Sequence, residues 1–188
     1  MTDWPFAPLI PLSYDVIIAD PPWSYDRWSD TNQSKGAADQ YETMEAADIA
    51  RLPVGHLARG DCLLLLWACG CMLPQAIEVM RAWGFTFKSE IVWRKITKAG
   101  KPRMGTGYRV RTLHEPILVG TNGSPVHSAF PSLFDGIARE HSRKPEEFYH
   151  LVQKHTLGLR TADLFSRETR YGFHGWGNEH GKFDQVAA

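Results

Sequence analysis

The sequence has neither a long apolar run nor a net charge. Its longest apolar run covers residues 62–69, well short of the ~20 residues that a membrane-spanning helix needs. Residues 1–11 contain three prolines and no Lys or Arg, so we expect no secretory signal. Lys and Arg number 21, as do Asp and Glu, which excludes a uniformly basic nucleic-acid-binding surface. These absences predict a cytoplasmic protein that does not associate with membranes.

Cysteine is also scarce. Cys62, Cys69 and Cys71 are the only three, and an odd number argues against a framework of disulfides. A structural zinc site would need four ligands at regular spacing, and no second Cys or His pair lies close by in sequence. We therefore expect reduced thiols and no metal.

The length and composition are those of one globular domain, which we place at residues 1–188. Apolar residues make up 43% of the chain and charged residues 22%. The charges are unevenly distributed, however. Residues 1–50 contain nine acids and two bases, whereas residues 94–111 contain seven bases and no acid. The neutral total thus conceals one strongly basic segment.

Segments with the pattern of strands alternate with segments with the pattern of helices. The predicted strands are residues 14–20, 62–68, 87–95, 116–120 and 161–166, and the predicted helices are residues 43–51, 74–82 and 145–155. This alternation predicts an α/β fold with a mostly parallel sheet. Ligands of such sheets bind at the carboxyl ends of the strands.

A candidate site follows the first predicted strand, at Asp20-Pro21-Pro22-Trp23. The two prolines lack backbone N–H groups but keep their carbonyl oxygens as acceptors on a stiff turn. An acid, these acceptors and an aromatic side chain suit a planar ligand that carries an amino group, such as adenine. The alternative is an ordinary turn after a strand, because Asp and Pro are common there.

Further motifs follow in a fixed order along the chain. They are Tyr41-Glu42-Thr43-Met44, Leu66-Trp67, Ile91-Val92-Trp93-Arg94-Lys95, His114-Glu115, Ser142-Arg143-Lys144-Pro145-Glu146-Glu147, Asp163-Leu164-Phe165-Ser166-Arg167 and Trp176-Gly177-Asn178-Glu179. Together with Asp20-Pro21-Pro22-Trp23, this series resembles the MT-A70 family of adenine methyltransferases. The resemblance extends from Tyr14 to about His180.

The resemblance implies a Rossmann-like fold for S-adenosyl-L-methionine-dependent methyl transfer. Its sheet is mostly parallel with helices on both faces, and its motif order is circularly permuted, so that the catalytic motif precedes the cofactor-binding motifs. This order accounts for the lack of a Gly-rich loop after the first strand. We read Gly105-Thr106-Gly107 as part of a flexible basic loop instead.

The resemblance also assigns roles to individual residues. The catalytic residues are Asp20, Pro21, Pro22 and Trp23. The cofactor-binding residues are Asp20, Lys144, Phe165, Arg167, Asn178 and Glu179. The substrate-binding residues are Tyr41, Lys98, Lys101, Arg103, Arg111, His114 and Glu115. Each assignment has a structural alternative: Lys144 as a solvated lysine before a helix, Arg167 as a surface ion pair, the basic run as a solvated loop, and His114-Glu115 as the start of a strand. The chain departs from the usual family pattern at Glu168-Thr169-Arg170, which leaves assignments beyond Arg167 open.

The expected function is methylation of the exocyclic amine, N6, of adenine in nucleic acid, with S-adenosyl-L-methionine as the cofactor and DNA preferred to RNA. The alternatives are an RNA methyltransferase and a catalytically inactive nucleic-acid-binding partner of this family. The size and reduced thiols suit a bacterial protein or a phage protein in its host. A domain of this size lacks room for a separate target-recognition domain, so specificity would come from loops, a homodimer or a partner subunit.

Overall fold

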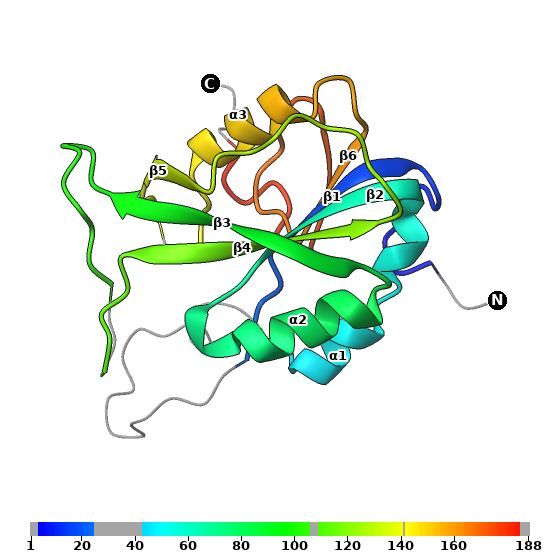
Figure 1. Cartoon of the computed structure of the whole chain (residues 1–188), viewed down its shortest axis with the longest axis horizontal. Coiled ribbons are helices and arrows are strands. Elements are labelled where there is room, and N and C mark those ends of the chain that lie inside the picture. The colour runs from blue at the N-terminus through cyan, green and yellow to red at the C-terminus, as the bar shows by residue number, and fades with distance from the viewer. Residues whose placement is uncertain (1–3, 25–42, 106–108, 141, 185–188) are drawn as a thin grey trace.

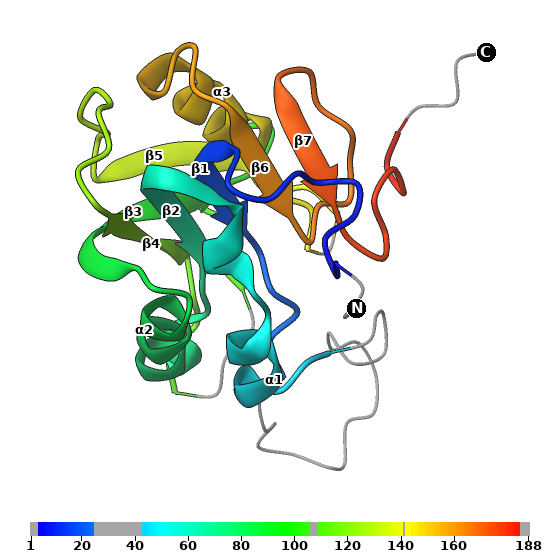
Figure 2. The same cartoon turned by 90° about the vertical axis from the view of Figure 1, so that its right-hand side faces the viewer.

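The computed structural model shows a seven-stranded sheet with helices on both faces (Figures 1 and 2). The structure describes residues 4–24, 43–105, 109–140 and 142–184. The strands are β1 (Tyr14–Ala19), β2 (Ala58–Trp67), β3 (Thr86–Ile96), β4 (His114–Asn122), β5 (Leu133–Ile137), β6 (Thr161–Leu164) and β7 (Phe173–Trp176). The α-helices are α1 (Ala46–Arg51), α2 (Leu73–Ala82) and α3 (Glu146–His155), and the short 3-10 helices are η2 (Val54–Leu57) and η3 (Gly70–Met72).

The strand order is β5-β3-β4-β2-β1-β6-β7. Strand β4 runs antiparallel to its neighbours β2 and β3, and the other adjacent pairs are parallel. Helices α1 and α2 lie on one face and α3 on the other (Figure 2). The predicted α/β class, the mostly parallel sheet and the helices on both faces are therefore confirmed.

Three differences from the predicted elements have local causes. Helix α1 begins only at Ala46, because Met44 exchanges backbone hydrogen bonds with Pro22 and Ser24 and is extended. Strand β6 ends at Leu164, because Phe165 has a positive φ of 61°. The sequence predicted neither β5 nor β7, two short edge strands in which exposed positions and a glycine hide any apolar alternation.

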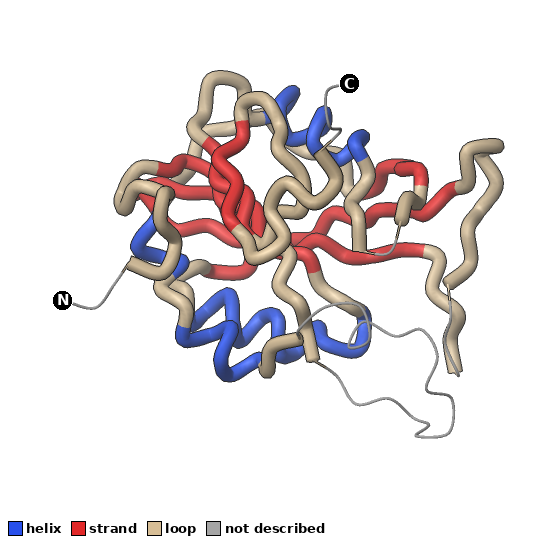
Figure 3. The backbone as a smooth tube through the Cα atoms, turned by 180° about the vertical axis from the view of Figure 1, so that it is seen from behind, coloured by secondary structure: helices blue, strands red, loops and turns tan. Residues whose placement is uncertain are grey.

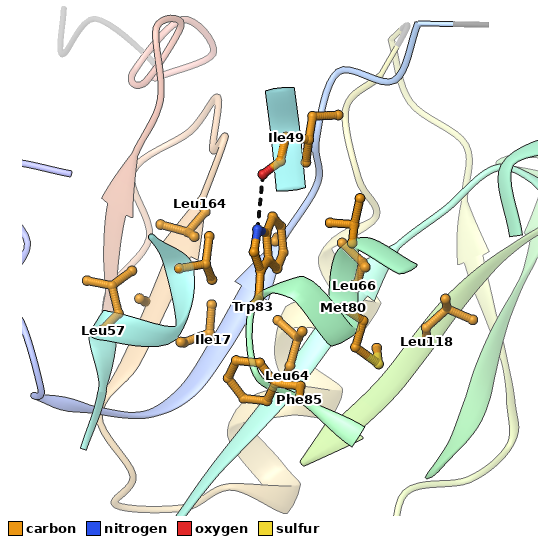
Figure 4. Packing of buried hydrophobic residues seen from close by; sticks show 14 of the residues in the cluster. Ile17, Ile49, Leu57, Leu64, Leu66, Met80, Trp83, Phe85, Leu118 and Leu164 are labelled. Atoms are coloured by element: carbon orange, nitrogen blue, oxygen red, sulfur yellow. Dashed lines mark hydrogen bonds between the residues drawn. The ribbon is translucent and has the colours of Figure 1, made fainter. Parts of the chain in front are cut away.

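The core on the face of α1 and α2 contains the side chains shown in Figure 4. Ile17 of β1 and Leu64 and Leu66 of β2 point to this face, as expected for side chains two residues apart in a strand. Trp83, directly after α2, is buried among them and donates a hydrogen bond from its indole nitrogen to the carbonyl of Ile49, at 3.0 Å. This bond ties α1 to the end of α2.

The opposite face of the sheet packs against α3. Phe148, Tyr149 and Val152 of α3 are buried there, and Trp67 and Trp93 contribute from β2 and β3. Helix α3 begins after Pro145, with Glu146 and Glu147 in its first turn, as its sequence predicted. The start of α3 lies beside the carboxyl ends of the central strands, and the side chains before it reach the candidate site.

Two features of the topology direct attention to one edge of the sheet. Strand β1 has β2 on one side and β6 on the other, and the crossovers to them pass over opposite faces, so their carboxyl ends form a topological switch point. Beyond the carboxyl end of β3, the described residues of the β3–β4 connection, 97–105 and 109–113, extend away from the sheet (Figure 3).

Candidate active site

The alternation of side chains along the strands brings four polar or aromatic residues to one place. Val16 and Ile18 of β1 face α3, and Asp20 follows them with the same parity. Trp67, at the end of β2, also faces α3. Lys95 lies two residues beyond Trp93 in β3, and Glu115 lies two residues before the buried Ile117 in the antiparallel β4. All four side chains therefore lie on the α3 side of the carboxyl edge.

A continuous line of ion pairs connects the three charged residues, Asp20, Glu115 and Lys95, through Lys144. The Lys144 ammonium lies 3.0 Å from Oδ1 of Asp20 and 3.1 Å from Oε2 of Glu115. The other carboxylate oxygen of Glu115 pairs with Lys95. Lys144 is largely buried, with 12% of its side chain exposed. A buried pair at these distances is a charge-assisted hydrogen bond rather than a surface contact.

Burial and neighbouring charge act in opposite directions on this cluster. Burial raises the pKa of Asp20, and Lys144 offsets part of that rise. Burial would also raise the pKa of Glu115, but Lys144 and Lys95 outweigh it and lower that pKa to about 2. Desolvation disfavours the Lys144 ammonium, yet Asp20 and Glu115 outweigh it and hold the Lys144 pKa above its usual range. Lys144 thus remains protonated and favours the ionised form of Asp20.

The turn after Asp20 is held by hydrogen bonds to both prolines. The carbonyl of Pro21 accepts the N–H of Trp23 at 2.9 Å, and the carbonyl of Pro22 accepts the N–H of Met44 at 2.8 Å. A carbonyl oxygen has two lone pairs, so each can accept one more bond. Trp23 is only 5% exposed, and its indole nitrogen donates to the carbonyl of Trp67 at 3.0 Å. The turn is therefore rigid, and Trp23 forms part of its wall.

A pocket adjoins this turn, between the end of β6 and the segment before α3. Its lining includes Asp20, Lys144, Phe165 and Arg167. Phe165 takes the left-handed backbone conformation, which is unfavourable for a non-glycine residue and is often found at functional sites. Gly177 packs closely against this bend, because a Cβ there would lie 2.9 Å from the carbonyl oxygen of Ser166. The bend at Phe165 thus requires a glycine at residue 177.

The structure brings most of the predicted cofactor-binding residues to this pocket. Asp20, Lys144, Phe165 and Arg167 line it directly. Glu179 reaches it through an ion pair with Arg167. Asn178, which is exposed, lies between Gly177 and Glu179 on the same loop.

The predicted substrate-binding residues divide into two groups. Glu115 lies inside the ion-pair line, with His114 exposed beside it at the start of β4. The bases Lys98, Lys101 and Arg103 are exposed on the β3–β4 connection. Arg111 donates from Nε to the carbonyl of Gly105 within that connection. Tyr41 lies outside the described residues.

Sequence reasoning missed a second charged network beside the pocket. Glu168 accepts hydrogen bonds from Arg139, Arg143 and Arg170, and Glu146 pairs with Arg139 and Arg170. This network occupies the part of the chain that departs from the family pattern, at Glu168 and Arg170. No sequence signal showed it, because its members are scattered over the segment after β5, α3 and the β6–β7 connection.

Other site types find little support in the described parts of the chain. No group of three or more His, Cys, Asp or Glu side chains there could hold a metal ion. All three cysteines carry free thiols, as the sequence predicted. None of the helices described is long and apolar enough to span a membrane. The chemistry that remains is that of a carboxylate and carbonyl acceptors at the mouth of a cation-lined pocket.

Comparison with known proteins agrees with this geometry. The family model MT-A70 matches residues 14–179, which include both the turn and the pocket. The chain is 30% identical over 176 residues to a putative N(6)-adenosine-methyltransferase MT-A70-like protein of Medicago truncatula. It is 25% identical over 183 residues to the type II methyltransferase M.MunI of a Mycoplasma species, and 28% identical over 165 residues to METTL3, the human N(6)-adenosine-methyltransferase catalytic subunit.

These matches cover different shares of the relatives. They include 88%, 88% and 82% of this chain, respectively. Of the relatives themselves, they cover 26% of the Medicago protein, 77% of M.MunI and 26% of the human protein. The chain thus spans about a quarter of two of these relatives and most of the third.

Proposed function

The chain belongs to the MT-A70 family, and on this basis we propose that it transfers a methyl group from S-adenosyl-L-methionine to N6 of adenine in nucleic acid, with DNA as the preferred polymer. The observation that carries the proposal is the position of Asp20. Its carboxylate lies at the switch point of the sheet, 3.0 Å from the buried Lys144 ammonium and in the lining of the pocket.

Asp20 and the Pro21 carbonyl would act on the adenine amine. The N6 lone pair is delocalised into the ring, so the nitrogen is a weak nucleophile. Two acceptors that bind its two N–H groups favour the tetrahedral nitrogen needed for attack. The ionised Asp20 also stabilises the positive charge that develops on this nitrogen. Trp23, nearly buried, would border the base as part of the wall.

The pocket residues fit S-adenosyl-L-methionine by the chemistry of their donors and acceptors. When bound, the cofactor supplies an electrophilic sulfonium methyl group. Asp20 can accept from its amine. The described contacts of Lys144 use two of its three N–H donors, which leaves one for the cofactor carboxylate. Arg167, Asn178 and Glu179 would hold its ribose and adenine, with Phe165 as the apolar surface.

The exposed bases of the β3–β4 connection would bind phosphates near the mouth of the site. They follow the carboxyl end of β3, and β3 runs in the same direction as β1, which Asp20 follows, so both lie at the same edge of the sheet. The target amine is paired inside a duplex, so the base has to be extruded or already unpaired. M.MunI is a type II methyltransferase, and the match covers 77% of its length. This relative supports DNA as the preferred polymer. We further propose a cytoplasmic location, in line with the three free thiols.

Asp20→Asn tests the proposal directly. The substitution preserves size but removes the negative charge, so we expect methyl transfer from labelled cofactor to DNA to fall about 100- to 1,000-fold. Asp48→Asn is the matched control, because Asp48 is exposed on α1 and pairs with Arg51. If Asp20→Asn retained more than about a tenth of the wild-type rate, Asp20 would not be the catalytic carboxylate. Wild-type protein inactive on adenine in DNA and RNA alike would overturn the proposed function.

A further inference from the structure

Trp67 lies at the carboxyl end of β2, directly behind the ion-pair line. It is 1% exposed and is among the largest fully buried side chains of the described residues. Its ring contacts Trp93 and Phe148 edge to face, with centroid distances of 5.9 and 4.8 Å. These neighbours belong to β3 and α3, so the indole is fixed by two separate elements.

The Lys144 ammonium lies over the face of the Trp67 ring. Nζ of Lys144 lies 4.6 Å from the ring centroid, within the range of a cation–π interaction. The same ammonium pairs with Asp20 and Glu115. The aromatic face thus restricts the positions that the Lys144 ammonium can take when its carboxylate partners move or exchange contacts.

The backbone of Trp67 acts on the other half of the site. Its carbonyl accepts the indole N–H of Trp23 at 3.0 Å and so fixes the end of the catalytic turn. The next residue, Ala68, donates its N–H to the carbonyl of Pro116 in β4. One residue therefore contacts both Trp23 and Lys144, which approach from segments more than a hundred residues apart.

We propose that Trp67 is a positioning residue that sets the place of the Lys144 ammonium relative to Asp20. The role rests on the proposed methyl transfer, because that reaction gives Lys144 and Asp20 their tasks. Trp67 acts through Lys144 and touches neither reactant.

The indole nitrogen of Trp67 indicates that the side chain acts on Lys144 through its ring face and not through a hydrogen bond. Nε1 is buried and has no hydrogen-bond partner among the described residues. The N–H therefore contributes nothing to the placement of Lys144, and the ring face is what counts. Trp67→Phe keeps an aromatic face and removes the unpaired donor, whereas Trp67→Leu removes the face and keeps an apolar side chain.

Trp83 provides a matched control on the opposite face of the sheet. It is also a buried tryptophan, at 3% exposure, and it packs between α1 and α2 (Figure 4). Trp83→Leu should destabilise the protein through the loss of similar packing, but it leaves the surroundings of Lys144 unchanged.

The decisive measurement is the NMR signal of the Lys144 ε-methylene protons in protein labelled with carbon-13 lysine and free of cofactor. Lys144→Arg identifies this signal by its loss. A cation over an aromatic face is shifted upfield by the ring current. We expect the upfield shift in the wild type and in Trp83→Leu, a reduced shift in Trp67→Phe, and its loss in Trp67→Leu.

Cofactor titration provides the second measurement. Trp67→Leu should weaken S-adenosyl-L-methionine binding about tenfold, Trp67→Phe at most about threefold, and Trp83→Leu not at all in its folded fraction. A Lys144 signal without an upfield shift in the wild type, or one unchanged in Trp67→Leu, would overturn the role of Trp67. If Trp67→Leu does not fold, the upfield shifts of the Lys144 signal in the wild type and in Trp67→Phe decide whether Trp67 has this role. Because the NMR signal needs neither cofactor nor substrate, a wild type that fails to methylate would refute the proposed function while this test still stands.

Discussion

At the residue scale, the electrostatics of the site depend on Lys144. Burial favours the neutral form of Asp20, and only the adjacent ammonium opposes that tendency strongly. A carboxylate that must accept an N–H and stabilise positive charge has to be ionised. Lys144 thus has a role that continues whether or not its third N–H binds a ligand.

The pH dependence of methyl transfer should reveal this role. The raised pKa of Asp20 places the acid limb of the kcat/KM profile above the pH at which an exposed aspartate titrates. Lys144→Met removes the cation that lowers this pKa, so the limb should move to higher pH. The kcat/KM values of Lys144→Met and of the wild type, measured from pH 5 to pH 9, check the direction of this shift. A limb that moves to lower pH, or stays in place, would contradict the coupling of Lys144 to Asp20.

Asp163 is a buried carboxylate, and its ionisation affects the stability of the fold. Burial raises its pKa to about 7, against the attraction of Arg170. Because the folded-state pKa exceeds the unfolded value of 3.8, the contribution of Asp163 to stability is full below pH 3.8 and is lost as the pH rises through 7. The corresponding change is up to about 4 kcal/mol.

Asp163→Asn should therefore remove a pH-dependent cost. As the pH rises from 5 to 8, we expect the free energy of unfolding of the variant to increase by about 1–4 kcal/mol relative to that of the wild type. Denaturant unfolding at pH 5 and at pH 8 measures this change. The exposed Asp48→Asn serves as the reference and should show no such gain. An equal stability difference at pH 5 and pH 8 would show that Asp163 does not titrate in this range.

At the scale of elements, sequence periodicity predicted most strands and helices because their apolar patterns are strong. The run from Cys62 to Ala68 is continuously apolar, which is typical of a strand buried on both faces and predicted β2; in the structure its side chains alternate between the two cores. The antiparallel direction of β4 could not be predicted, since a short buried strand has the same pattern in either direction. Strands β5 and β7 were not predicted, because each is a short edge strand defined by its pairing with a single neighbour.

The candidate site shows the same division. The family resemblance, carried by the motifs and their order, predicted Asp20, Lys144, Phe165 and Arg167, which the structure brings together. It did not reveal that Glu115 and Lys144 share an ion pair, because β4 and the segment before α3 are distant in sequence. Parity could have pointed to Lys95, which lies two residues beyond the buried Trp93.

The basic connection between β3 and β4 is the element expected to bind phosphates. Two bases of the basic segment 94–111 lie before this connection, at the end of β3, and form ion pairs: Arg94 pairs with Asp135 and Lys95 with Glu115. Neutralising the exposed Lys98, Lys101 and Arg103 to Gln should weaken binding to all DNA sequences. Each lost phosphate contact should reduce the slope of log K against log salt by about 0.9 for duplex DNA.

The matched control removes three exposed bases elsewhere, Arg81, Lys88 and Lys154. It changes the net charge equally but should leave the salt slope unchanged, because these residues lie away from the carboxyl edge. Cofactor affinity should be the same in both triple variants. Equal slopes for the connection variant and the wild type would show that this element does not contact phosphates.

At the scale of the whole molecule, a neutral total charge limits how the chain can hold nucleic acid. With 21 bases balanced by 21 acids, long-range attraction to the polymer is weak, and binding has to come from the local basic connection. One short connection offers little surface to stabilise a base extruded from a stable duplex. A second copy or a partner subunit would add such surface.

Substrate preference should follow from this limited surface. We expect the isolated chain to methylate single-stranded or locally opened DNA faster than a stable duplex, because an unpaired adenine avoids the few kcal/mol of unstacking. The comparison uses DNA and RNA oligonucleotides of one sequence, single- and double-stranded, in competition at equal salt. None of the assigned residues is a recognised reader of the 2′-hydroxyl, the group by which a protein selects RNA. DNA should therefore compete at least as well as RNA. A clear preference for the RNA strand would refute the choice of DNA and leave the adenine chemistry of Asp20 in place, whereas a preference for duplex DNA would show that the chain supplies more contacts to the polymer than its basic connection offers.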